Sequence, residues 1–135
     1  MDNIHQVYDF LRHADYYMLA TTDGNQPRVR PFGTINLFEG RLYIETLHTK
    51  RVVRQLALNP LVEICAMSHE GDAWIRVAGT LVDDTRVEAK HAMMEAYPEL
   101  RTIYDEHSDE TAVYYFRDAV AWISREGQPD EEFRF

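Results

Sequence analysis

The spacing of apolar residues changes along the chain between the period of a helix and the period of a strand. At the start, Ile4, Val7 and Leu11 recur at the three- and four-residue steps of one helix face, which predicts a short helix ending near Asp15. Alternating apolar and polar residues then indicate short strands. Six or seven strands are expected, over residues 16–22, 28–36, 41–46, 61–67, 73–82, 112–116 and 119–124.

Helical periodicity returns twice between these strands. One helix is predicted from Lys50 to Asn59, where the following proline disfavours helical backbone. Another begins after the cap at residues 83–85 and runs to about Tyr97, with a further helical piece from Pro98. Strands and helices therefore share the chain, and the strands outnumber the helices.

Short antiparallel strands in this number leave exposed edges unless the sheet closes on itself. The pattern therefore predicts a small closed barrel with peripheral helices, an α+β fold that is mainly β. Pro31 and Gly33 interrupt the second strand, which indicates an edge or a bulge there. The strands are expected to end at Ser124, before a polar tail over residues 126–135. The length of 135 residues suits one domain, spanning 1–135.

Composition narrows the class of protein. No run of about eighteen apolar residues and no basic, apolar leader is present, so neither a membrane partner nor export is expected. Cys65 is the only cysteine, which excludes an intrachain disulfide and suits the cytoplasm. The formal net charge of −9 argues against nucleic acid as a partner. Glu88 and His91 have a spacing seen in metal sites, but no second such pair accompanies them, and no metal is expected.

Cations and hydroxyls gather in two segments of this acidic chain. Arg28 and Arg30 lie on the second predicted strand, and Thr46–Arg51 joins the third strand to the helix that follows it. A helix start offers free N–H groups and about half a positive charge, so hydroxyls and cations placed there suit a phosphate monoester. The alternative is that Thr49 only caps the helix and that the two cations after it are solvated.

Several fragments of the sequence, taken in order, also resemble one known family. They are Leu-Ala-Thr-Thr-Asp-Gly, Pro-Arg-Val-Arg-Pro-Phe-Gly, Gly-Arg-Leu-Tyr-Ile-Glu-Thr, Thr-Lys, Gln-Leu, Asn-Pro, Val-Glu-Ile and Trp-Ile-Arg-Val-Ala-Gly. Each is weak alone, but their order and spacing from about Tyr17 to Ile123 are similar to those of the pyridoxamine 5'-phosphate oxidase-related FMN-binding split barrels. The resemblance implies a split barrel that binds FMN.

The resemblance also implies a place for each part of FMN. The phosphate would be held by four side chains, those of Thr46, Thr49, Lys50 and Arg51. Arg28 and Arg30 would offer charge to the phosphate and the ring, while the backbone from Val29 to Pro31 would border the pyrimidine edge of the isoalloxazine. Gln55 either reaches the ribityl chain or the ring, or is a solvated helix position. A guanidinium and an ammonium suit this task because they form charge-assisted hydrogen bonds to phosphate.

Members of this family are typically homodimers with the flavin between the subunits. The resemblance therefore implies that a side chain of the second copy covers the cofactor, and Trp122 and Arg76 are the candidates. The alternatives are that Trp122 is an ordinary core residue and that Arg76 forms an ion pair at the subunit interface.

The function implied is that of a flavoprotein oxidoreductase with a small-molecule substrate that the sequence does not identify. Authentic pyridoxamine phosphate oxidases end in an Arg-rich substrate segment, whereas this chain ends with a single arginine in residues 131–135, so oxidation of vitamin B6 phosphates is not expected. Short relatives also resemble nitroimidazole-resistance proteins, which implies reduction of a nitroaromatic or quinone-like compound. No catalytic acid or base is identified. The alternative is a protein that binds flavin, deazaflavin or haem without turnover, with His48 as the candidate haem ligand.

Overall fold

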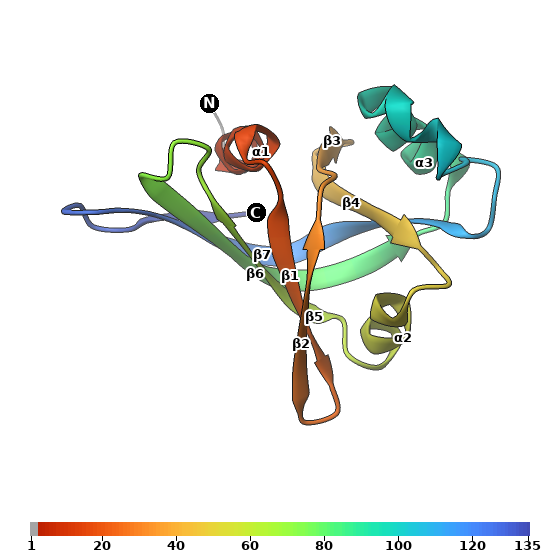
Figure 1. Cartoon of the computed structure of the whole chain (residues 1–135), viewed down its shortest axis with the longest axis horizontal. Coiled ribbons are helices and arrows are strands. Elements are labelled where there is room, and N and C mark those ends of the chain that lie inside the picture. The colour runs from red at the N-terminus through yellow and green to blue at the C-terminus, as the bar shows by residue number, and fades with distance from the viewer. Residues whose placement is uncertain (1–2) are drawn as a thin grey trace.

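The structure is a computed structural model that describes residues 3–135. These residues form eight strands, three α-helices and one 3₁₀ helix (Figure 1). The helices are α1 (Asn3–His13), α2 (Arg51–Leu58), α3 (Val87–Ala96) and the 3₁₀ helix η1 (Pro98–Thr102). The strands are β1 (Tyr17–Asp23), β2 (Gln26–Phe32), β3 (Asn36–Phe38), β4 (Arg41–Leu47), β5 (Leu61–Met67), β6 (Ala73–Asp84), β7 (Thr111–Arg125) and β8 (Glu131–Arg134). The predicted helices are confirmed, but the expected cap at residues 83–85 is wrong, because β6 runs to Asp84 and the N-cap of α3 is Arg86, with no side-chain cap. The strands number eight rather than six or seven.

All eight strands belong to one antiparallel sheet with the order β2-β1-β5-β6-β7-β4-β3, and β8 pairs with β7 beside this path. Within the described residues no ladder joins β2 to β3 or β4, so the sheet curls without closing. The expectation of a closed barrel is therefore wrong, and the α+β, mainly-β split barrel is what the chain forms. The opening lies between β2 and β4, where the expected strand over residues 28–36 divides into β2 and β3 around Gly33, Thr34 and Ile35.

Strand β7 is continuous where two strands were expected. Asp118 adopts a positive φ of 52°, and the register with β6 shifts between Ala78 and Thr80. Gly79 makes the close approach possible, because a Cβ there would lie 3.1 Å from the Cβ of Ala119. The bulge bends β7, so that its first half pairs with β4 and its second half pairs with β8.

The polar tail was expected to contain no strand, and this is also wrong. Residues 131–134 form β8, which pairs with residues 120–123 of β7. Phe133 explains the pairing, because it is the apolar anchor of the strand and is only 6% exposed.

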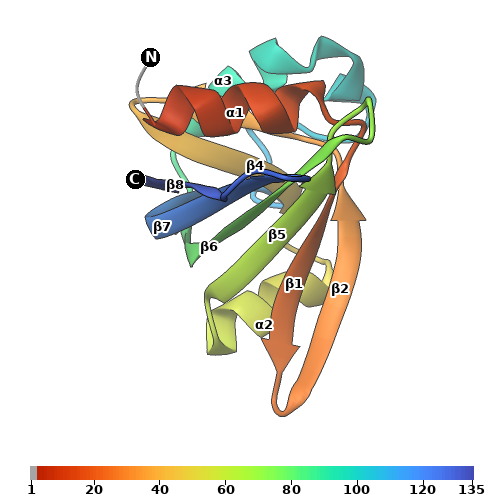
Figure 2. The ribbon, with the colours of Figure 1, turned by 90° about the vertical axis from the view of Figure 1, so that its left-hand side faces the viewer.

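The core forms on the concave face of the sheet. Leu19, Ile64 and Val77 are opposite one another on β1, β5 and β6, and all three are fully buried. Alternation along each strand places these residues on one face and their neighbours on the other. Figure 2 shows α1 across one end of the sheet and α2 at the other end, and their buried residues include Val7 and Leu56. Fully burying an aliphatic side chain of this kind contributes about 1.5–3 kcal/mol.

No helix in the described part of the chain is long and apolar enough to cross a membrane.

Candidate functional site

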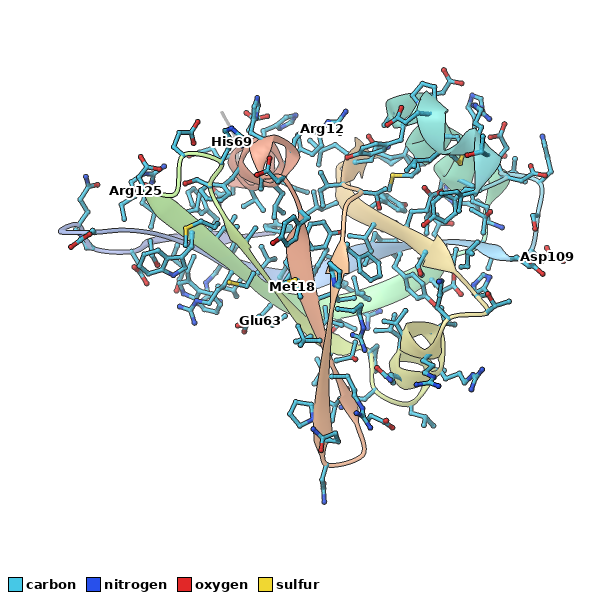
Figure 3. The ribbon with its side chains drawn as sticks, viewed as in Figure 1. Arg12, Met18, Glu63, His69, Asp109 and Arg125 are labelled. Atoms are coloured by element: carbon cyan, nitrogen blue, oxygen red, sulfur yellow. The ribbon has the colours of Figure 1, made fainter. Side chains whose placement is uncertain are left out.

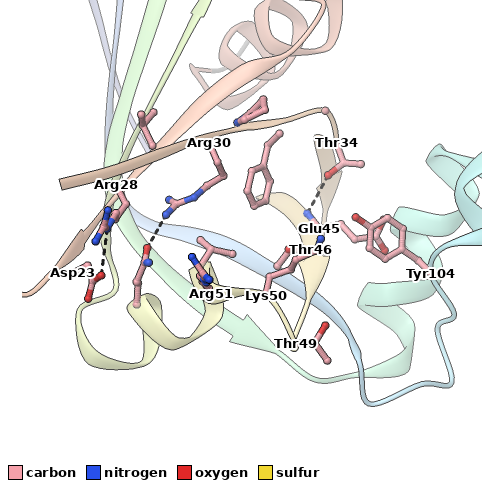
Figure 4. Close-up of a pocket in the computed structure, with 16 residues that line it drawn as sticks. Asp23, Arg28, Arg30, Thr34, Glu45, Thr46, Thr49, Lys50, Arg51 and Tyr104 are labelled. Carbon is pink, nitrogen blue, oxygen red and sulfur yellow. Dashed lines mark hydrogen bonds and ion pairs between the residues drawn. The ribbon is translucent and has the colours of Figure 1, made fainter. Parts of the chain in front are cut away.

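A pocket of about 770 Å³ lies at the opening between the two ends of the sheet (Figure 4). It is bordered on one side by β2 and the residues that follow it, on the other by β4, and by the start of α2. Nine of the ten residues expected to contact the cofactor line it, namely Arg28, Val29, Arg30, Pro31, Thr46, Thr49, Lys50, Arg51 and Gln55. The fold therefore brings the two cationic segments together.

The pairing of β1 with β2 explains why the arginines face the pocket. Arg30 is opposite Leu19, at the end of the row of buried core residues, and Arg28 is opposite Thr21. Both side chains therefore lie on the concave face of β2. This is the edge strand next to the opening, where the row of buried core residues ends. Val29 and Pro31 also border the pocket, although alternation directs their side chains to the convex face.

Arg30 is fixed by a network of hydrogen bonds. Its Nη1 donates to the carbonyl of Leu19 at 3.1 Å and to Thr21 Oγ1 at 2.8 Å, and its Nη2 donates to Gln55 Oε1 at 2.6 Å. Thr21 Oγ1 donates to the same Gln55 oxygen at 2.5 Å. Burial, and then the charge of Arg28, lower the pKa of the Arg30 guanidinium. Gln55 is buried, so it is not the solvated helix position that the sequence left open.

The start of α2 keeps its cations available. Lys50, with extended backbone, is the N-cap residue, and no side chain caps the helix. The alternative that Thr49 is the cap is therefore wrong. Lys50 and Arg51 are exposed, and no ion pair within residues 3–135 engages either of them. Arg28, by contrast, pairs with Asp23 at 3.3 Å on the exposed rim.

Glu45 and Tyr104 are two of the pocket residues that the sequence did not assign to the site. Glu45 is 2% exposed on β4, and burial raises the pKa of its carboxyl group to about 8. Tyr104 comes from the loop after η1, and burial, followed by the negative charge of Glu45, raises the pKa of its phenol. A carboxylate between Ile44 and Thr46 in an apolar strand was a signal for Glu45. Nothing in the sequence indicated Tyr104, because the packing of a distant loop places it there.

Trp122 is the predicted residue that lies away from the pocket. It is on the convex face, where its ring is 5.3 Å from Arg76 Cζ and its Nε1 donates to Glu132 Oε1 at 3.1 Å. It is also only partly buried and so is not an ordinary core residue. Within one chain, Trp122 and the pocket are on opposite faces of the sheet.

His48 is also outside the pocket. Its Nε2 is 2.9 Å from Asp83 Oδ2, and its Nδ1 is 2.5 Å from the carbonyl of Asp109. Both ring nitrogens are therefore engaged, and no histidine, cysteine or methionine of the described chain lines the pocket. This arrangement gives haem none of those axial ligands.

Comparison with solved structures identifies the family. A NimC/NimA family protein from Clostridium acetobutylicum is 37% identical, over 98% of this chain and 92% of its own, with a TM-score of 0.94. The chain belongs to the NimC/NimA family. No family model matches the sequence, and no curated protein matches it.

More distant structures place the NimC/NimA chain among the split barrels. A general stress protein 26-related protein of the pyridoxinephosphate oxidase family, also from Clostridium acetobutylicum, is 14% identical over 100% of this chain and 97% of its own, with a TM-score of 0.69. A heme binding protein from Mycobacterium smegmatis is 14% identical over 99% of this chain and 58% of its own, with a TM-score of 0.76. At these identities the likeness shows the fold alone. The resemblance to the pyridoxamine phosphate oxidase-related split barrels is thereby confirmed.

Proposed function

We propose that this NimC/NimA family member is an FMN-binding flavoprotein, built as one domain, that catalyses oxidation–reduction of a small molecule. The observation that carries the proposal is the pocket, which gathers four cations from β2 and α2 in a chain of net charge −9. Its volume of about 770 Å³ is within the range of cofactor sites. The uncapped start of α2 and its free cations fit a phosphate group.

Different residues around the pocket would bind different parts of FMN. Lys50, Arg51, Thr46 and Thr49 would hold the phosphate, because they surround the open helix start. Arg28 and Arg30 would add charge from the edge strand, and Val29 and Pro31 would border the ring. Gln55 Oε1 already accepts two hydrogen bonds, which orients the amide and leaves its nitrogen for the ligand.

We further propose that the protein is a homodimer and that the convex face is the interface. Four apolar side chains on or beside this face are at least 40% exposed, those of Val29, Leu61, Met67 and Trp74. Met18 and Glu63, labelled in Figure 3, belong to the same face. Cross-strand pairing forms a row across it from Pro31 through Met18, Cys65 and Arg76 to Trp122.

That row supports a role for the second copy in the site. Pro31 and Val29 belong both to the convex face and to the rim of the pocket. A second copy that covers this face would therefore reach the rim, and Trp122 is the large side chain with which it would cover the cofactor. Arg76 is stacked on Trp122 and would hold the indole in place.

The bound flavin would supply the electron transfer, and the chain would supply position and electrostatics. The proposed substrate is a nitroaromatic or quinone-like compound that enters beside the ring. Vitamin B6 phosphates are not proposed, because Arg134, the one arginine of β8, is bonded to Glu132 at 3.2 Å. The exposed thiol of Cys65 supports a reducing compartment, the cytoplasm.

The test is the visible spectrum and FMN titration of the purified protein. Flavin bands and saturable quenching of FMN fluorescence are expected, and a Soret band would support the alternative of a haem-binding protein. Bound flavin reduced with dithionite without oxygen should then be reoxidised by a nitroaromatic or a quinone faster than reduced free FMN. A protein that neither contains nor takes up FMN contradicts the proposal. A protein that binds FMN without accelerating reoxidation is a storage or sensing protein.

A further inference from the structure

Glu45 is the one buried side chain of the described residues that has polar atoms without a partner. It is 2% exposed, and neither Oε1 nor Oε2 has a hydrogen-bond partner within residues 3–135. The backbone around it is satisfied, because the Glu45 N–H donates to Thr34 Oγ1 at 3.1 Å. The fold therefore buries this carboxyl group in the wall of the pocket and leaves its two oxygens unbonded.

The surroundings of Glu45 favour the neutral acid. Four cations line the same pocket, yet none within the described chain forms an ion pair with this carboxyl group. An unpaired buried carboxylate costs several kcal/mol, and burial accordingly raises the pKa of Glu45 to about 8. A protonated carboxyl group carries an O–H donor that the carboxylate lacks.

The ionisable groups around Glu45 leave this donor unused. Those along the pocket are Asp23, Arg28, Arg30, Lys50, Arg51 and Tyr104. Those in the layer beneath α3 are Tyr43, Tyr97 and Lys90, which are bonded to Asp84, Ile35 and the carbonyl of Ser108. Strand β7 presents the apolar Val113 opposite Glu45, and β3 carries no ionisable side chain.

Glu45 lies at one end of the pocket. Figure 4 shows Glu45 beside Thr34 and Tyr104, at the end of the pocket away from Arg28 and Asp23. The cationic rim and this uncharged end are thus parts of one cavity. A molecule that fills the cavity would have the cations at one end and Glu45 at the other.

We propose that Glu45 is a ligand-binding residue that is protonated in the resting protein and donates a hydrogen bond to an oxygen acceptor of the molecule in the pocket. Loss of the proton removes the donor and places a negative charge against that oxygen. Binding is therefore linked to pH, and the pocket selects ligands that offer an oxygen acceptor at this end. The inference rests on the proposed function, because FMN is the molecule used to test it.

The experiment measures FMN affinity by fluorescence quenching between about pH 7 and pH 9, above the second ionisation of a phosphate near pH 6. The protein is compared with Glu45→Gln, whose amide keeps a donor at every pH, and with Glu88→Gln, an exposed glutamate on α3 outside the pocket. Wild type and Glu88→Gln should lose affinity about tenfold over this interval, because the protonated fraction falls by that factor. Glu45→Gln should keep its affinity.

Riboflavin identifies the acceptor. If wild type loses affinity for FMN but not for riboflavin, the acceptor is the phosphate, and if it loses both, the acceptor is on the ribityl chain or the ring. The carbonyl infrared band of a protonated carboxyl group, present in the ligand-free protein at pH 7 and absent in Glu45→Gln, reports the resting state independently of binding.

Two results would overturn the inference in different ways. Identical pH profiles for wild type and Glu45→Gln, with FMN bound at pH 7, would show that Glu45 does not contact the ligand and would leave the FMN proposal intact. No FMN binding at any pH would remove the proposed function together with the inference that rests on it.

Discussion

Asp84 and Glu45 are two buried carboxyl groups that lie opposite the same residue, Val113 of β7, one from each side. Asp84 is 7% exposed and accepts hydrogen bonds from Tyr43 at 2.7 Å and from Arg86 Nη2 at 2.9 Å. These partners, Arg86 first, lower the pKa of Asp84 to about 2. Glu45 has no such partners, and burial raises its pKa to about 8. Two buried carboxyl groups thus have opposite charge states, and the one without partners lines the pocket.

The largest expected effect is a difference between wild type and Glu45→Gln in how the free energy of unfolding changes with pH. Below the ordinary pKa of 4.5 both the folded and unfolded states of wild type are protonated at this position. Between 4.5 and about 8 only the unfolded state releases the proton, so wild-type stability falls as pH rises. At about 1.4 kcal/mol per pKa unit, wild type should lose roughly 3–5 kcal/mol relative to Glu45→Gln over this range. Urea unfolding at several pH values measures it, and parallel curves would show that Glu45 is charged in the fold.

Asp84→Asn tests the second carboxyl group of the comparison. Here the stability of wild type changes with pH in the opposite direction. The folded pKa of about 2 is below the ordinary value of 3.8, so the stabilisation is present above pH 3.8 and is lost as pH falls towards 2. The variant should be about 2–3 kcal/mol less stable than wild type at neutral pH, and the difference should vanish near pH 2. If the variant is still less stable than wild type at acid pH, the loss of stability is caused by altered packing and not by the lost charge.

Lys50→Ala examines a group that, like Glu45, has no partner in the described chain. FMN binding should weaken by roughly 1.5–3 kcal/mol, the usual contribution of a hydrogen bond to a charged group, and riboflavin binding should change much less. Arg54→Ala is the matched control, because Arg54 is an exposed cation of α2 that does not line the pocket. Equal FMN affinity in all three proteins would show that the phosphate is bound elsewhere.

The smallest effect expected is that of Trp122→Ala on the convex face. Light scattering of wild type should give about twice 15.8 kDa, and the variant should release flavin more readily while its unfolding midpoint changes little. A loss of about 1 kcal/mol in FMN affinity is expected, because an aromatic pair contributes about 0.5–1.5 kcal/mol beyond its area. A monomeric protein that binds FMN tightly would contradict the dimeric site.

The parts of the fold that local signals determine could be predicted. The strand-to-helix junction at Thr46–Arg51 follows from a change of period, and α2 ends where Pro60 requires it. The bulge in β7 could not be predicted, because its cause is Gly79 on another strand. Strand β8 was missed because Phe133 is a lone apolar residue in a polar segment, and only pairing with β7 buries it.

Some residues of the candidate site could likewise be predicted from the sequence, and others could not. The cations of β2 and α2 were predicted because each segment carries its own signal, and the fold brings them to one pocket. The surroundings of Glu45 depend on Thr34, which lies between β2 and β3, and on the loop that carries Tyr104, which is distant in sequence. The contact proposed for Trp122 depends on a second copy of the chain and stays a prediction.

The prolines of β2 have a consequence for how the protein avoids misassembly. Strand β2 pairs on one side only, with β1, and residues 27, 29 and 31 turn their backbone groups to the same side. Pro27 and Pro31 have no N–H, so they suit the free side, where only Val29 is left to donate. A strand from another molecule would find one donor where a regular edge offers three, which disfavours edge-to-edge aggregation at the part of the barrel that must stay open.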